Sequence, residues 1–241
     1  MELLNPLISE YTWAELPDAD DVAVGTEVFN TTYQVKVRSN GTSWMYLGIG
    51  TATLSALPLP TAVPSGTKFN ITDLGTGSAV FMSNGSHWLP VGEVLLFVDP
   101  VGTTLTATTT ETVLTTFTLN KKLASPKMTI VVNSVWSMNN SANIKNPRVR
   151  FGGIMGAEYV NTQIASNSSF QSECLIRFKN ALNSQVGMAS TQWPAYSAGG
   201  GATVASSLDM SVNDADIVLT GQLANAADNL TLRAYTVTLR G

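Results

Sequence analysis

The chain has 241 residues, of which 44% are apolar and only 12% are charged, and its net charge is −4. This length suits one large domain or a small module followed by a β-sandwich. The composition excludes a basic stripe for the phosphate backbone of nucleic acid, and no apolar run reaches the length of a membrane-spanning helix.

Residues 1–12 form a short lead into the first recognisable element. Apolar side chains recur in it at helical spacing, at Leu3, Leu4, Leu7 and Ile8. Pro6 limits any helix to about one turn. The lead lacks a basic stretch followed by an apolar core, so we expect no secretory signal. We interpret it as an anchoring segment that docks on another subunit or on a larger assembly.

A tight turn that ends on a tryptophan occurs twice, at residues 39–44 and 83–88. The Asn-Gly pair in each turn tolerates the positive φ angles of a type I′ hairpin turn. Side-chain character alternates before each turn, which predicts a hairpin whose return strand carries Trp44 or Trp88. The pattern is an internal repeat, and each copy is too small to bury a core without a neighbour.

The repeat extends upstream of each hairpin, where a Leu-Pro pair precedes a Gly-Thr pair. The matched positions are Leu16-Pro17 with Leu59-Pro60, and Gly25-Thr26 with Gly66-Thr67. These matches predict copies over residues 13–49 and 57–92, with residues 50–56 as a connector.

The composition changes after the second copy. Residues 94–98 are typical of a short buried strand, and a turn follows at residues 99–102. Ten of the sixteen residues from Thr103 to Thr118 are threonine, a residue that favours extended structure with solvent-exposed faces. We place the boundary near residue 110, so that residues 13–110 hold both repeats with their linker and residues 111–241 form the second part.

The second part is predicted to consist of many short strands. Their signals lie at residues 113–119, 128–136, 148–151, 173–179, 216–223 and 230–239. Turn-rich segments separate them, and no apolar stripe of helical spacing exceeds two turns. We therefore predict an all-β chain, with two small N-terminal β-hairpin repeats followed by a jelly-roll-like antiparallel β-sandwich.

The sequence offers few groups for catalysis. His87 is the only histidine, and Ser43 occupies its position in the first repeat, so we interpret it as a surface residue rather than a general base. Cys174 is the only cysteine, which excludes an internal disulfide and leaves too few ligands for a zinc site. We predict no catalytic, cofactor-binding or metal-binding residue.

Two acidic loops are candidates for calcium sites, with Asp18, Asp20 and Asp21 in one and Asp214 and Asp216 in the other. Calcium takes about six to eight oxygen ligands, and neither loop has EF-hand spacing, so we interpret both as solvated loops. Glycoside hydrolysis needs two carboxylates that face each other, and the sequence alone does not show such a pair.

Four aromatic side chains are candidates for surface or inter-subunit contacts: Trp44, Trp88, Trp193 and Tyr196. Trp193 and Tyr196 share one long loop with the glycine run at residues 199–201. An exposed Trp or Tyr can stack on a sugar ring or pack on a neighbouring subunit. We favour the subunit contact.

The pattern of Leu-Pro, Gly-Thr, Ser-Asn-Gly and Trp, over residues 16–44 and again over 59–88, resembles the small β modules repeated in tailed-bacteriophage fibre and virion proteins. Residues 136–151 and 220–228 resemble a phage β-sandwich. Together these stretches cover most of the chain. The resemblance implies a homotrimer and carries over no catalytic residue, because the motif contains none.

We therefore expect a non-enzymatic structural protein of a tailed-phage virion, assembled in the cytoplasm of the bacterial host. It would form a homotrimeric fibre or spike whose lead binds other virion proteins of the tail, the portal region or the capsid. The sandwich would face outward and is a candidate for contact with a host surface glycan. One alternative is a capsid decoration (cement) protein that binds the major capsid lattice, and a weaker one is a glycan-degrading tail spike.

Overall fold

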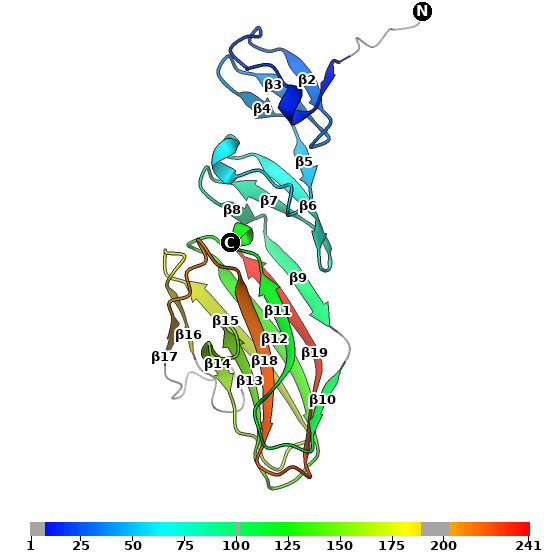
Figure 1. Ribbon diagram of the computed structural model, residues 1–241, viewed down its shortest axis with the longest axis vertical. Coiled ribbons are helices and arrows are strands. Elements are labelled where there is room, and N and C mark those ends of the chain that lie inside the picture. The colour runs from blue at the N-terminus through cyan, green and yellow to red at the C-terminus, as the bar shows by residue number, and fades with distance from the viewer. Residues whose placement is uncertain (1–7, 100–101, 189–202) are drawn as a thin grey trace, which may run out of the picture. The chain divides into compact units, whose positions relative to one another are not determined.

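A computed structural model describes residues 8–99, 102–188 and 203–241 of the chain. The described residues form β-strands, turns and three short 3-10 helices, so the prediction of an all-β chain is confirmed (Figure 1). None of these helical turns is long and apolar enough to cross a membrane. The chain divides into two compact units, Met1–Val91 and Gly92–Gly241.

The first unit contains two four-stranded sheets, one for each copy of the repeat (Figure 1). The first sheet has the order β1 (Glu10–Tyr11), β2 (Glu27–Asn30), β3 (Val35–Ser39) and β4 (Trp44–Tyr46). The second has the order β5 (Ile49–Ala52), β6 (Lys68–Leu74), β7 (Gly77–Ser83) and β8 (Trp88–Pro90). In both sheets the first strand is parallel to the second, and the rest are antiparallel.

Each sheet buries one face, as the alternating sequence predicts. In β3, Val35 and Val37 are buried while Lys36 and Arg38 are exposed, because successive side chains of a strand point to opposite faces. The buried face lies against the segment that enters β2 or β6. That segment contains a short helix in each copy, η1 (Trp13–Glu15) or η2 (Pro60–Ala62).

The hairpins are confirmed, but their turns are not of type I′. Residues 40–43 form a loop between the paired Ser39 and Trp44, and the second copy matches it. Within these described turns, the positive φ angles belong to Gly41 (91°) and Gly85 (88°). Each asparagine instead caps the turn through its Oδ1, which accepts backbone N–H groups two and three residues later at 2.7–3.0 Å.

Matching hydrogen bonds correct the alignment of the two copies. Ser39 Oγ donates to the carbonyl of Ala19 at 2.7 Å, and Ser83 Oγ donates to that of Pro60 at 2.9 Å. Leu16-Pro17 therefore corresponds to Leu57-Pro58 rather than to the next Leu-Pro pair, at the same spacing that separates Gly25 from Gly66. The two consecutive Leu-Pro pairs of the second copy made the sequence match ambiguous.

The parallel first strands also shift the predicted limits of the repeats. Glu10 pairs with Phe29, so the end of the predicted lead belongs to the first sheet. Gly50 pairs with Phe69, so the predicted connector at residues 50–56 begins with β5. Both strands find their partners about twenty residues later, and no local pattern signals that pairing.

The two copies share a core within one chain. Tyr33 and Tyr46 of the first copy contact Phe69 of the second, with ring centroids 5.0 and 5.4 Å apart. Phe69 also contacts Trp88 at 5.5 Å. Edge-to-face pairs of this kind contribute about 0.5–1.5 kcal/mol beyond their buried area. Each undersized module thus completes part of its core with the other.

The second unit is a sandwich of two antiparallel sheets (Figure 1). One sheet contains β9 (Glu93–Asp99), β10 (Thr103–Thr106), β19 (Asn229–Arg240), β12 (Thr129–Met138), β15 (Ser169–Phe178), β16 (Gln185–Met188) and β17 (Thr203–Ser206). The other has the order β11 (Thr112–Leu119), β18 (Ala215–Leu223), β13 (Lys145–Phe151) and β14 (Ala157–Asn161). The helical turn η3 (Lys121–Leu123) lies between β11 and β12.

The strand order is that of a jelly roll. Strands β9 and β10 pair with successive stretches of β19 and act as one edge strand. Strands β9 and β10 together count as the first of eight strands, and β16 and β17 form an extension outside the eight. In this numbering one sheet has the strand order first, eighth, third, sixth, and the other sheet has the order second, seventh, fourth, fifth. These orders define the double Greek key of a jelly roll, so the predicted architecture is confirmed.

The division between the two parts lies earlier than the boundary that the sequence predicts near residue 110. The second unit begins at Gly92, because β9 and β10 both pair with β19 at the far end of the chain. The change to threonine-rich sequence occurs inside the sandwich and not at its border. Residues 92–110 therefore belong to the jelly roll.

Candidate functional site

The repeated tryptophans are structural rather than exposed. Trp44 and Trp88 are buried, with relative exposures of 7% and 1%. Their Nε1–H groups donate to the carbonyls of Pro17 at 2.9 Å and Pro58 at 3.0 Å. Each Trp thereby fastens its return strand to the segment that covers the sheet. Neither forms the surface contact that the sequence suggested.

The other two aromatic candidates, Trp193 and Tyr196, lie outside the described residues. The glycine run at residues 199–201 lies outside them as well. The choice between a sugar contact and a subunit contact for these side chains stays a prediction.

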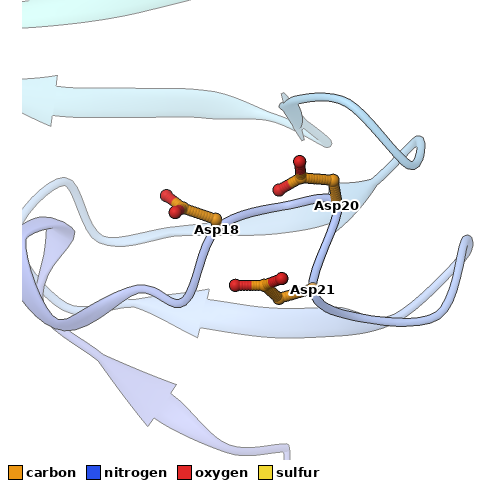
Figure 2. A group of neighbouring side chains, drawn as sticks. All are labelled: Asp18, Asp20 and Asp21. Carbon is orange, nitrogen blue, oxygen red and sulfur yellow. The ribbon is translucent and has the colours of Figure 1, made fainter.

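The first acidic loop does bring its three carboxylates together. Figure 2 shows Asp18, Asp20 and Asp21 on one turn between η1 and β2, with carboxylate oxygens within 4.8 Å of one another. All three side chains are exposed. A hard cation such as Ca²⁺ prefers oxygen ligands, and three carboxylates supply only part of a shell of about six to eight. The arrangement attracts cations electrostatically without forming an enclosed site.

The second acidic loop has a different role. Asp214 Oδ1 accepts the backbone N–H of Lys121 at 2.8 Å, and Asp216 Oδ1 accepts the hydroxyl of Thr118 at 2.6 Å. The second bond joins the end of β11 to the start of β18, and the first joins η3, directly after β11, to the residue before β18. The two aspartates therefore fix a strand pair.

His87 and Cys174 have no arrangement that activates them. Partial burial lowers the pKa of His87, which keeps the imidazole neutral at pH 7. Cys174 is buried, and burial together with the charge of Glu173 raises the pKa of its thiol. A thiol in such surroundings is a poor nucleophile, because the reactive species is the thiolate.

A semi-buried group of charges that the sequence analysis missed lies on the outer face of the second sandwich sheet. We name Glu111, Arg148, Arg150 and Glu158 the charge cluster. In β13 the two arginines alternate with core residues, which places them on the face opposite the core. The strict alternation at residues 148–151 was visible in the sequence, but the carboxylate partners come from distant segments.

The charge cluster is closely bonded. Glu111 accepts Arg150 Nε at 2.8 Å and Arg150 Nη2 at 3.0 Å, and its Oε2 lies 3.0 Å from Arg148 Nη1. Arg150 also pairs with Glu158 on β14. Thr220 Oγ1 on β18 donates to Glu111 at 2.5 Å. Because the two positive charges balance the two negative ones, the cluster fastens strands together rather than presenting a net charge.

The environment of Glu111 shifts its pKa. Burial acts to raise the pKa, but the hydrogen bonds from Arg150 and Thr220 and the charges of both arginines outweigh burial and lower it below 4.5. A carboxyl with a depressed folded-state pKa stabilises the fold fully above its unfolded-state pKa. That contribution is lost as the pH falls through the folded-state value.

We expect the free energy of unfolding of the sandwich to fall as the pH drops below about 4.5, the ordinary pKa of a glutamate. Glu111→Gln should lower stability at pH 7 and flatten the acid dependence, because Gln does not titrate. Urea unfolding between pH 3 and pH 7 measures both effects. An equally steep acid dependence in Glu111→Gln would contradict this assignment, and Glu173→Gln serves as a control on the other sheet.

A second missed group lies at one end of the sandwich. We name Asn139, Ser141, Lys145 and Asp228 the loop-end network. Lys145 is fully buried, and its Nζ donates to the Oγ of Ser141 at 2.5 Å and to its carbonyl at 3.1 Å. Asp228 Oδ1 accepts the Ser141 hydroxyl at 2.8 Å and Asn139 Nδ2 at 2.6 Å. The network ties the β12–β13 loop to the β18–β19 loop.

The loop-end network is not arranged as a nucleophile with a base. The hydrogen bond from Asn139 is the largest of several effects that lower the pKa of Asp228, and the charge of Lys145 adds to them. A carboxylate whose pKa is lowered is a weak base. The hydrogen bond that the Ser141 hydroxyl donates to Asp228 therefore holds the two loops together.

The outward faces of the module sheets carry a repeated apolar feature. Met45 and Leu47 in the first copy correspond to Leu89 and Val91 in the second, and we name these four residues the edge stripe. Leu89 is half-buried and the other three are exposed. The stripe follows β4 and β8, which are the end strands of their sheets. The alternation after each tryptophan is the sequence signal that predicts it.

No known protein family and no curated protein matches the sequence. Among solved structures, the chain is similar to the structure of infectious bursal disease virus, Gx strain, with 10% identity and a TM-score of 0.26. That similarity covers 86% of this chain and 49% of the other, so the chain spans about half the length of its neighbour. A TM-score this low carries no argument about fold or function.

Proposed function

We propose that the chain is a non-enzymatic structural protein on the surface of a tailed-bacteriophage particle, where it forms a homotrimeric fibre or spike. The observation that carries this proposal is the combination of two fused, undersized β modules with a jelly roll. Jelly rolls recur in viral capsid and lectin domains. The protein is assembled in the cytoplasm of the bacterial host and is carried on the virion.

The use of the polar groups supports a structural role. The loop-end network connects loops, the charge cluster joins strands across a sheet, and the lone cysteine is buried. The lead segment anchors the fibre to other virion proteins, and the jelly roll is the part that meets the host surface and its glycans.

Labelling of intact virions tests this function. Antibodies raised against the purified chain should mark the tail or the vertices of phage particles in electron micrographs. Uniform label over the shell would instead indicate a capsid decoration protein that binds the major capsid lattice. Label absent from purified particles would overturn a virion role altogether.

Incubation with host polysaccharide separates the proposal from a glycan-degrading spike. We expect no release of reducing sugar by the purified protein. Release that disappears when a pair of facing carboxylates is replaced would show an enzyme. A glycan array then tests whether the protein binds sugars without cleaving them.

A further inference from the structure

The edge stripe is both apolar and located on strands at the edge of a sheet, two properties that a solvent-facing strand rarely has together. Met45, Leu47 and Val91 have relative exposures of 38%, 43% and 47%. They lie on or directly after end strands, whose outer backbone groups have no partner within the sheet. Antiparallel sheets usually present polar side chains to water. An apolar row at such an edge indicates a surface that another chain covers.

The two copies differ beside the stripe but agree within it. On the neighbouring strand, the outward residues are Lys36 and Arg38 in the first copy, and at the matching positions they are Val80 and Met82 in the second. Arg38 is neutralised by its ion pair with Glu27. The outward surfaces have therefore diverged next to the stripe, while both positions of the stripe are apolar in each copy.

In both copies a backbone hydrogen bond extends the pairing of the end strand by one residue beyond β4 or β8. Leu47 N–H donates to the carbonyl of Lys36 and Val91 N–H donates to that of Val80, each at 2.9 Å. These bonds fix the direction of the side chains beyond the last paired residue of β4 and β8. Since the modules share a core, the stripe is presented twice by one body, with one fixed spacing.

We propose that the edge stripe is the surface on which a second copy of this chain docks. A partner that covers both halves at once needs two apolar rows with the same spacing, and another copy of this chain provides them. Equivalent edges then meet about the symmetry axis of a homo-oligomer, as in the closed assemblies that most soluble oligomers form. This inference rests on the proposed homo-oligomeric function and assigns its contact to the modules.

The test is the mass of the full chain in solution, measured by light scattering for the wild type and for two double variants. Leu47→Lys with Val91→Lys places two charges in the stripe. Val113→Lys with Val135→Lys places two charges on sandwich residues of similar exposure, 45% and 41%. We expect the stripe variant to fall to the mass of one chain at a concentration where the wild type and the control remain assembled.

The other outcomes separate the two proposals. An assembled wild type with an equally assembled stripe variant would overturn the docking surface and leave the homo-oligomer standing. Dissociation by both double variants would also overturn the assignment to the stripe. A wild type that has the mass of one chain would overturn the docking surface and the trimer together. Circular dichroism of each variant confirms that the strands are retained.

Discussion

Replacement of Trp88 by alanine is expected to unfold the first unit well below the temperature at which the second unit melts. The substitution empties a site that is 99% buried, removes the ring contact with Phe69 and leaves the carbonyl of Pro58 without its donor. Truncation of a buried Trp costs about 3–5 kcal/mol. A unit of this size has about 5–10 kcal/mol in total.

Calorimetry of the full chain measures this effect. We expect one transition to move down by about 20 °C while the other stays in place, because the sandwich makes no use of Trp88 in its own sheets. Trp44→Ala should behave in the same way. Leu59→Ala is the control, since it shortens an exposed apolar side chain of the same unit outside the edge stripe. Equal shifts for Trp88→Ala and Leu59→Ala would show that the tryptophan is not a core residue.

Replacement of Lys145 by methionine is expected to destabilise the sandwich by about 3 kcal/mol. Methionine fills a similar volume, but it removes one donor from each oxygen of Ser141 and removes the positive charge near Asp228. Loss of one member of a buried charged network costs more than the net value of its bonds, because the remaining charge stays desolvated.

Chemical unfolding of the second unit measures this loss. Lys127→Met is the control, since Lys127 is an exposed lysine in the segment that precedes β12. We expect its effect to stay within about 0.5 kcal/mol. Adding Asp228→Asn to Lys145→Met should restore part of the stability, because the second substitution removes the uncompensated charge. A double variant whose losses simply add would contradict the coupling.

Local patterns in the sequence predicted the hairpins, the strands and the jelly-roll class. The Asn-Gly turns mark residues 39–44 and 83–88 clearly, and alternation along residues 148–151 defines a strand with one core face. These features depend on neighbours in the chain. The buried tryptophans were placed on the correct strands, but a hairpin pattern alone does not show which face another segment will cover.

Long-range pairing explains what the sequence did not reveal. Strand β10 pairs with β19 across more than half of the chain, so the threonine-rich composition gave a boundary that the contacts do not follow. The charge cluster joins Glu111 to arginines on β13, and the loop-end network joins Ser141 to Asp228. Each needs residues that become neighbours only when the Greek keys close.

The proposed fibre requires self-association of a chain whose small modules expose an apolar edge. Light scattering of the purified wild-type protein measures this association most directly. We expect a mass three times that of the 25.6 kDa chain. A folded protein that keeps the mass of a single chain at every concentration would contradict the proposed trimer.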